Sequence, residues 1–284
     1  MKLLRVGPPG GERPAVLAED GTLLDLSGAI TDFDGDFLAD GGINRVRGLL
    51  ELDLPPLRGR GLRIGPPLRR PGKIVCVGLN YHDHARETGV TPPAEPVLFL
   101  KAPDTVVGAC DEVLVPHGGD KTDWEIELAV VIGRTARYLS PADDALEYVA
   151  GYAISHDVSE RGFQLERGGQ WDKGKSCETF NPFGPWLVTR DEIPDPGHLG
   201  LRLWVNGTLR QNGNTKDMIF DVPEIIRYVS QFMTLYPGDI VNTGTPAGVA
   251  LGMPDPKPYL RPGDLVELEI DGLGRQRQRL GVAW

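Results

Sequence analysis

Hydrophobic and polar residues alternate over many short stretches of this chain, a spacing typical of β-strands. The strongest stretch is Trp124–Ile132 (WEIELAVVI), which alternates at first and then becomes continuously apolar, as a buried strand does. Further strands are predicted at Lys73–Val77, Val97–Leu100, Tyr152–Ser155, Leu201–Val205, Asp239–Asn242 and Leu265–Ile270. Asn206-Gly207 follows one of these strands and predicts a hairpin turn.

Two segments have a helical pattern instead. Asn80–Thr88 follows a Gly-Leu-Asn turn, and Val222–Phe232 carries Pro223 in its first turn, where proline is tolerated. Strands therefore outnumber helices. This balance favours an α+β, β-rich fold, with a mixed sheet arranged as a roll or barrel-like body, over a doubly wound parallel sheet.

The first part of the chain is predicted to form a separate module. Short strands are expected at Lys2–Val6, Pro14–Leu17 and Thr22–Leu26, and Pro55–Gly72 is rich in Pro, Gly and Arg, as linkers are. We therefore expect a small N-terminal domain over residues 1–70 and a catalytic domain over 71–284.

Composition narrows the function classes. The net charge is −10, and the one Arg-rich stretch, Arg58–Arg70, is interrupted by Gly and Pro, so a nucleic-acid partner is not expected. Three widely spaced cysteines argue against a disulfide framework and suit a reducing compartment. The start of the chain lacks the apolar segment of a signal peptide, and the longest apolar run, Leu128–Ile132, is too short to cross a membrane. These features predict a soluble, cytoplasmic protein without a membrane partner.

Two carboxylates on the strongest strand suggest a metal site. Glu125 and Glu127 are two residues apart, so in a strand they point to the same face. Two like charges within an apolar stretch are costly unless a cation neutralises them. Asp157 ends another apolar strand and could approach the pair. Oxygen ligands of this kind suit Mg²⁺, Mn²⁺ or Ca²⁺, although a solvated strand face would explain the Glu pair alone.

A histidine and a glutamate could supply a general base. His84 and Glu87 are three residues apart and would share one face of the predicted helix. A carboxylate beside an imidazole orients it and raises its basicity. A surface ion pair is the alternative, and spacing alone does not distinguish His84 from His82.

Two loop-like stretches carry further polar residues. Ser159–Phe183 contains Lys173 and Lys175. A lysine in this stretch could stabilise a developing enolate or could be an exposed loop lysine. Asn242–Gly248 (NTGTPAG) could present backbone N–H groups to a carboxylate, or could be a plain loop.

Six collinear segments resemble the fumarylacetoacetate hydrolase family. They are GLNYHDHARETG (78–89), LFLKAPDTVVG (98–108), DWEIELAVVIG (123–133), GYAISHDVSERGFQ (151–164), GKSCETFNPFGPW (174–186) and NTGTPAGV (242–249). The resemblance spans about residues 73–284. It implies a β-rich, roll-like catalytic domain behind a small N-terminal domain, usually in a homodimer.

The resemblance also assigns residues. It implies that Glu125, Glu127 and Asp157 bind Mg²⁺, with Mn²⁺ or Ca²⁺ as substitutes. By the same resemblance, the catalytic dyad is His84 with Glu87, the family lysine is Lys175, and the substrate contacts are Arg161, Gln164 and Thr245. Asn80 stands near the position where some relatives have a further aspartate ligand, so a fourth carboxylate is not expected.

The expected function is hydrolysis of a carbon–carbon bond in a small, anionic 2,4-diketo acid of the acylpyruvate type. The resemblance leaves alternatives: an isomerase, decarboxylase or hydratase of an unsaturated 2-oxo diacid, a ureidoglycolate lyase, or a hydrolase of diketo-deoxy sugar acids. A metal-binding module without catalysis is disfavoured because the three carboxylates, the dyad and Lys175 are all present.

Overall fold

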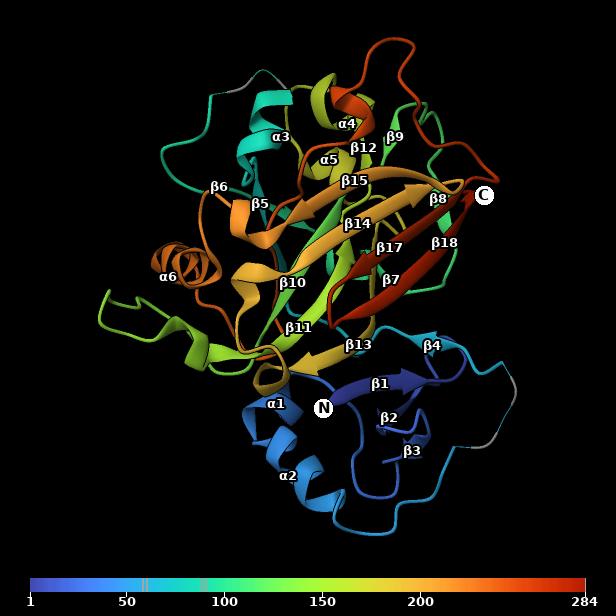
Figure 1. Ribbon diagram of the computed structural model, residues 1–284, viewed down its shortest axis with the longest axis vertical. Helices are drawn as coiled ribbons and strands as arrows, with labels where there is room; N and C mark the ends of the chain where they lie inside the picture. The colour runs from blue at the N-terminus through green and yellow to red at the C-terminus, as the bar shows by residue number, and fades with distance from the viewer. Residues whose placement is uncertain (58, 60, 88, 90, 284) are drawn as a thin grey trace.

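The computed structural model describes residues 1–57, 59, 61–87, 89 and 91–283. Within these residues, eleven strands form one mixed sheet in the order β3-β2-β1-β13-β11-β10-β16-β5-β6, with β4 beside β1 and β7 beside β13 (Figure 1). Their bounds are β1 Lys2–Val6, β2 Arg13–Leu17, β3 Leu23–Asp25, β4 Ile64–Gly65, β5 Ile74–Gly78, β6 Val97–Lys101, β7 Val106–Gly108, β10 Ile126–Ile132, β11 Val149–His156, β13 Asn181–Thr189 and β16 Ile240–Asn242.

A second sheet of the described chain has the order β15-β14-β17-β18-β8, and β12 pairs with β9 in a separate ribbon. These strands are β8 Val113–Val115, β9 Thr122–Asp123, β12 Ser159–Glu160, β14 Gly200–Val205, β15 Thr208–Asn214, β17 Leu265–Ile270 and β18 Gly274–Val282. The α-helices are α1 Gly35–Ala39, α2 Gly42–Leu49, α3 His82–Glu87, α4 Arg161–Leu165, α5 Asp172–Lys175 and α6 Val222–Phe232.

Strand β10 is buried on both faces because the main sheet is covered on both sides. Leu128 and Val130 point into a core shared with residues of β14 and β17, such as Leu203 and Leu268. Ala129 belongs to a second core on the opposite face. This double burial explains why the strand reads as a nearly continuous apolar run.

The N-terminal residues cover one part of that opposite face. Strand β1 pairs with β13, and Leu3, Phe33 and Val46 join the core that contains Ala129. Glu127 has the same strand parity as Ala129 and therefore faces the same side. Figure 1 shows β1–β3, α1 and α2 at one end of the molecule, while α3, α4 and α5 lie at the other. Glu127 lies on the part of this face that the N-terminal residues do not cover.

The predicted α+β, strand-dominated class is confirmed, and the sheets do not close into a barrel. The predicted strand Trp124–Ile132 begins instead at Ile126, because the chain leaves the β9–β12 ribbon at Asp123 before β10 joins β11. The predicted helix Asn80–Thr88 is observed as α3, His82–Glu87, and Thr88 lies outside the described residues.

The segment Pro55–Gly72 is not a plain linker, which corrects the sequence prediction. Ile64–Gly65 forms β4 and pairs with β1, and Arg63 makes ion pairs with Glu12 and Asp111. Arg58 and Arg60 lie outside the described residues. None of the helices in the described ranges is long and apolar enough to cross a membrane.

Candidate metal and active site

Three buried carboxylates meet at the ends of two central strands. Glu125 and Glu127 flank the first residue of β10, and Asp157 directly follows β11. The Asp157 N–H donates to the Glu125 carbonyl oxygen at 2.9 Å, which holds the two segments together. One oxygen of each carboxylate lies within 4.8 Å of the others. Antiparallel pairing of β10 with β11 therefore assembles the triad that the sequence predicted.

Buried cations surround two of these carboxylates. Lys175 Nζ donates to Glu125 Oε2 at 2.6 Å and to Asp157 Oδ2 at 2.7 Å. Lys101, at the end of β6, donates to the other Asp157 oxygen, Oδ1. Arg161 Nη2 donates to Glu125 Oε1 at 2.6 Å. Lys175 is thus a buried residue of α5 and not an exposed loop lysine.

Glu127 differs from its neighbours because it makes no ion pair within the described residues. Its Oε2 accepts the Gly244 N–H at 2.7 Å. Burial, followed by the charges of Asp157 and Glu125, raises the pKa of Glu127 well above its ordinary value. Burial would also raise the pKa of Glu125, but Lys175 and Arg161 outweigh it and hold that pKa below its usual range.

The charge balance of this cluster fits a divalent cation. With Asp123, which accepts Arg161 Nε at 2.9 Å, four buried carboxylates face three buried cations, Lys101, Arg161 and Lys175. With every carboxylate ionised, the described cluster would carry one net negative charge, and Glu127 is the carboxylate without a cationic partner. Hard oxygen donors around such a charge suit Mg²⁺, Mn²⁺ or Ca²⁺.

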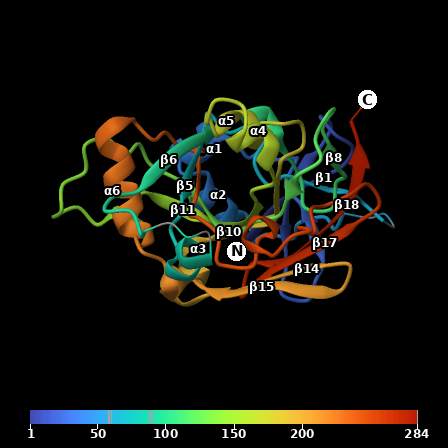
Figure 2. The ribbon, with the colours of Figure 1, turned by 90° about the horizontal axis from the view of Figure 1, so that it is seen from above.

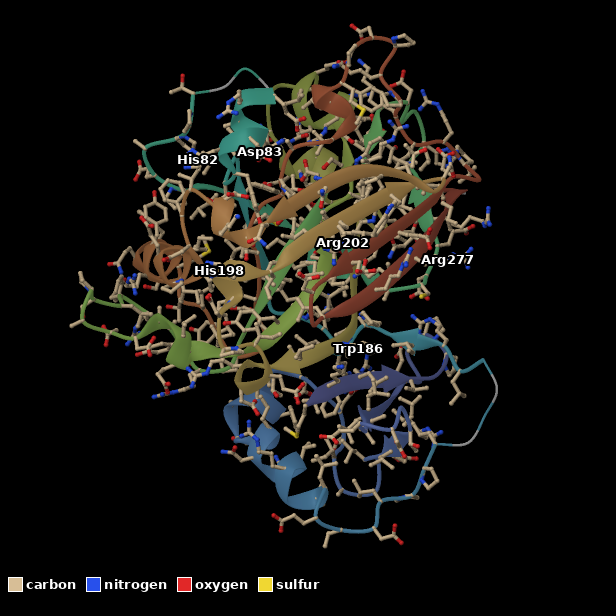
Figure 3. The ribbon with its side chains drawn as sticks, viewed as in Figure 1. His82, Asp83, Trp186, His198, Arg202 and Arg277 are labelled. Atoms are coloured by element: carbon tan, nitrogen blue, oxygen red, sulfur yellow. The ribbon has the colours of Figure 1, made fainter. Side chains whose placement is uncertain are left out.

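Helix α3 presents the predicted dyad. His84 Nδ1 lies 2.8 Å from Glu87 Oε1, and the Gly248 N–H donates to Glu87 Oε2 at 3.0 Å. His84 is buried, whereas His82 is exposed on the outer side of the same helix (Figure 3). The burial and the carboxylate contact therefore distinguish the two histidines that spacing could not.

Asn80 positions α3 and does not face the carboxylates as a ligand. Its Nδ2 donates to the carbonyl oxygens of Phe220 and Thr243 at 3.0 and 2.7 Å, and its Oδ1 accepts the Phe220 N–H at 2.8 Å. These backbone contacts use the whole amide group. The expectation of no fourth carboxylate ligand agrees with this geometry.

Glu125, Glu127 and the His84–Glu87 dyad line one cavity of about 440 Å³. Seen from above, α3, α4, α5 and β6 surround the end of β10 (Figure 2). The lining comprises Leu79, His84, Glu87, Phe99, Glu125, Glu127, Arg161, Gln164, Leu165, Trp171, Lys175, Thr245, Leu251, Gly252 and Lys257. Eight of the nine predicted site residues are among them; Asp157 lies beneath the floor, bound to Lys175.

The three predicted substrate contacts are not equally free to bind a ligand. Gln164 Oε1 accepts Arg161 Nη1 at 2.9 Å, which leaves the Gln164 NH₂ group as a donor. The Thr245 hydroxyl donates to the Ile126 carbonyl oxygen and accepts from Gln211 Nε2, both at 2.8 Å. Its proton is therefore engaged within the protein, and a substrate contact by Thr245 stays a prediction.

Sequence reasoning did not single out three residues that shape the site. Lys101 ends the apolar strand VLFLK, a pattern like that of Asp157, and this signal could have identified it. Asp123 accepts the N–H groups of Ala250 and Leu251 as well as Arg161. Gln211 fastens β10 to Thr245, and nothing in its sequence context marks that role.

The protein has a sheet-dominated fold, and the acidic groups in its cavity, beside a His–Glu pair, could bind a divalent metal ion. Residues 73–281 match the model of the fumarylacetoacetate (FAA) hydrolase C-terminal family. A Burkholderia multivorans protein whose name describes it provisionally as a hydrolase is 52% identical over 278 residues, which is 98% of each chain.

Two solved structures extend the comparison over the whole chain. Maleylpyruvate hydrolase from Sphingobium sp. SYK-6, in complex with manganese (II) ion and pyruvate, is 30% identical with a TM-score of 0.82. The 5-carboxymethyl-2-hydroxymuconate delta-isomerase from Mycobacterium smegmatis is also 30% identical, with a TM-score of 0.78. Each alignment covers 100% of both chains. The chain belongs to the fumarylacetoacetate hydrolase family.

Proposed function

We propose that this protein is a divalent-metal-dependent hydrolase that cleaves a carbon–carbon bond in a small 2,4-diketo acid of the acylpyruvate type. The observation that carries the proposal is the shared cavity, which is lined both by Glu125 and Glu127 of the buried carboxylate triad and by the His84–Glu87 pair. The carboxylate side of the cavity can hold a 2-oxo acid through a metal ion, and the His84–Glu87 side can activate water. The likeness to a maleylpyruvate hydrolase supports this reading.

Glu125, Glu127 and Asp157 would hold the metal ion, and we propose Mg²⁺, with Mn²⁺ as a substitute. When bound, the ion would supply Lewis-acid chemistry to the carboxylate and keto oxygens of the substrate. The uncompensated Glu127 charge favours such an ion, because a buried carboxylate without a cation is costly.

The remaining steps belong to the side chains of the cavity. His84, oriented by Glu87, would take a proton from water, whose oxygen adds to the distal carbonyl carbon. The Gln164 NH₂ group would donate to the oxyanion that forms. The carbon–carbon bond then breaks, its electron pair passes to the pyruvate fragment as an enolate beside Lys175, and the proton taken by His84 returns to that carbon. Pyruvate and a second acid leave.

A comparison of His84→Gln with His82→Gln tests this assignment, because both replace a histidine of α3. With an acylpyruvate and Mg²⁺, His84→Gln should lower kcat by about 10² to 10⁴, the usual contribution of a general base. His82→Gln should retain the parent rate, since His82 is exposed. Mn²⁺ should still raise the Tm of both variants, because neither change replaces a carboxylate of the proposed metal-binding triad.

Two results would contradict the proposal. One is an unchanged rate in His84→Gln. The other is a wild-type protein that isomerises unsaturated 2-oxo diacids with Mg²⁺ and leaves every acylpyruvate intact. Oxalate, which mimics the pyruvate enolate, should add to the Mg²⁺-induced rise in Tm if the three carboxylates form the chelating site.

We also propose that the enzyme is a cytoplasmic homodimer that needs no nucleic-acid or membrane partner. The homodimer is what the family resemblance of the sequence implies. Light scattering on the purified chain, with and without Mg²⁺, measures it directly.

A further inference from the structure

One cation in the cavity has a different environment from the others. Lys257 lies in the loop that follows the 3-10 turn Ala250–Gly252, and its side chain lines the cavity. Its Nζ donates to the carbonyl oxygens of Leu251 and Met253, both at 2.6 Å. An ammonium group has three N–H donors, so these two contacts leave one for a ligand.

The positive charge of Lys257 has no carboxylate partner within the described part of the chain. Its contacts are neutral carbonyl groups, whereas Arg161 pairs with Asp123 and Glu125, and Lys175 pairs with Glu125 and Asp157. Those two cations are balanced by the acidic cluster. The charge of Lys257 is therefore available to a ligand that brings its own anion.

Lys257 lies on the side of the cavity that carries the dyad. The two carbonyls that it binds flank Gly252, and a Cβ built on Gly252 would come within 2.7 Å of the Glu87 carboxyl carbon. The cation thus sits in the wall against which Glu87 rests.

Apolar side chains make up much of the remaining lining. Leu79, Phe99, Leu165 and Trp171 all face this cavity. A charge–charge contact is stronger beside such groups than in open water, because the effective dielectric constant is lower.

We propose that Lys257 is a specificity-determining residue that binds a carboxylate on the tail of the substrate. This inference rests on the proposed function, in which the 2-oxo acid end occupies the carboxylate side of the cavity and the scissile bond faces the dyad. The tail beyond the distal carbonyl then points toward the wall that carries Lys257. The preferred substrates are acylpyruvates with a second acid group.

Succinylpyruvate and butyrylpyruvate form a matched pair for the test, because their tails differ only in a terminal carboxylate or methyl group. A hydrogen bond to a charged group contributes about 1.5–3 kcal/mol, so wild-type kcat/KM should favour succinylpyruvate about 10- to 100-fold. Lys257→Met should remove that preference, so kcat/KM should fall about 10- to 100-fold more for succinylpyruvate than for butyrylpyruvate. Lys257→Arg, which keeps a cation with several donors, should retain the preference.

Two controls separate this role from loop support and from net charge. Lys216→Met also removes one positive charge, but Lys216 is exposed and lies outside the cavity lining, so the preference should persist. If Lys257→Met lowers kcat/KM equally for both substrates, the residue supports the loop and the inference is wrong. Wild-type protein that hydrolyses both substrates without preference also overturns it, while the proposed function stands.

The opposite failure is distinguishable by binding. If neither substrate is cleaved, titration calorimetry with Mg²⁺ still compares the two compounds as ligands. Tighter binding of succinylpyruvate that disappears in Lys257→Met then supports Lys257 as the carboxylate receptor and refutes the hydrolase proposal. Equal affinities in the wild type refute both.

Discussion

Glu125 and Glu127 are two residues apart on one face, yet their surroundings give them opposite electrostatic character. Two buried cations contact Glu125, and together they lower its pKa despite the burial. Glu127 has a backbone N–H as its partner, and its pKa is raised. In the metal-free protein, one carboxylate therefore stabilises the fold and the other destabilises it when both are ionised.

Glutamine substitutions should separate these two effects. In EDTA, Glu125→Gln should lower the free energy of unfolding by about 3–5 kcal/mol, the usual cost of breaking a buried ion pair. Glu127→Gln should leave stability equal to or above that of the parent, because it removes an uncompensated charge. Urea denaturation measures both, and equal destabilisation would contradict the assignment. Both variants should lose the Mn²⁺-induced rise in Tm.

Lys101 holds the oxygen of Asp157 that Lys175 does not contact. Its side chain is fully buried, so Lys101→Met leaves part of a buried charge unpaired. We expect the free energy of unfolding to fall by about 3–5 kcal/mol. The matched control is Lys121→Met, since Lys121 forms an exposed pair with Glu166 and its loss should cost under about 1 kcal/mol. Equal losses of unfolding free energy in the two variants, measured by urea denaturation, would contradict a larger contribution from the buried Lys101–Asp157 pair.

At the scale of elements, the dyad depends on how closely a loop approaches α3. Gly252 contacts the Glu87 carboxylate so closely that any side chain there must displace it. Gly252→Ala should therefore move Glu87 away from His84 and lower kcat by about 10-fold or more, a smaller loss than removal of the base itself. Thermal stability should change little, because the displaced group is the end of a flexible side chain.

Gly28→Ala is the control for this substitution. No atom lies within 4 Å of a Cβ built at Gly28, so both kcat and Tm should match the parent. Retention of full activity in Gly252→Ala would mean that Glu87 does not need its observed position to orient His84.

The elements that the sequence predicted well are those with a simple apolar pattern. Helix α6 was predicted with its observed bounds, and the apolar strands β10, β11 and β17 were found to within a few residues. The pattern also placed Glu125 and Glu127 on one face of a strand and His84 with Glu87 on one face of a helix, but it did not choose between His84 and His82. Family resemblance was needed for Arg161, Gln164 and Lys175, because α4 and α5 are too short to show a helical period.

Strands β13 and β18 are among those that the sequence pattern missed, because they contain prolines and glutamines, which are more typical of loops. Strand β13 contains Pro182 and Pro185, which lack N–H groups, and Gln276 Nε2 donates to the carbonyl oxygens of Ile154, Pro182 and Gly184. In β18 the buried positions include glutamines, while residues such as Arg277 point outward (Figure 3). Because glutamine and arginine are both polar, their alternation in the sequence gives no sign of a buried face.

At the scale of the whole molecule, the opposite pKa shifts make stability depend on pH in two windows. The raised pKa of Glu127 means that its contribution is fully present below the unfolded value, near 4.5, and is lost as pH rises through the folded value. The lowered pKa of Glu125 gives stability that is present above 4.5 and is lost as pH falls through its folded value.

Metal binding should oppose the loss of folding stability that ionised Glu127 causes. The ion needs ionised ligands, so its affinity should rise with pH through the Glu127 pKa, and binding should release a proton. Calorimetric titration of Mn²⁺ in two buffers with different ionisation enthalpies measures that proton. Glu127→Gln, which should not bind Mn²⁺, gives the background heat of the titration. A wild-type affinity that does not vary with pH would contradict the raised pKa.

The floor of the cavity and its walls come from different kinds of structure. The floor is made at the ends of β10 and β11, in the middle of the main sheet, whereas α3, the α4–α5 segment and the loop around Lys257 form the walls. A wall segment can therefore be exchanged without rebuilding the strand ends that form the floor. A hydrolase and an isomerase, each 30% identical to this chain, share its fold, as such a division of floor and walls would allow. This division also makes the walls the place to graft new substrate preferences by design.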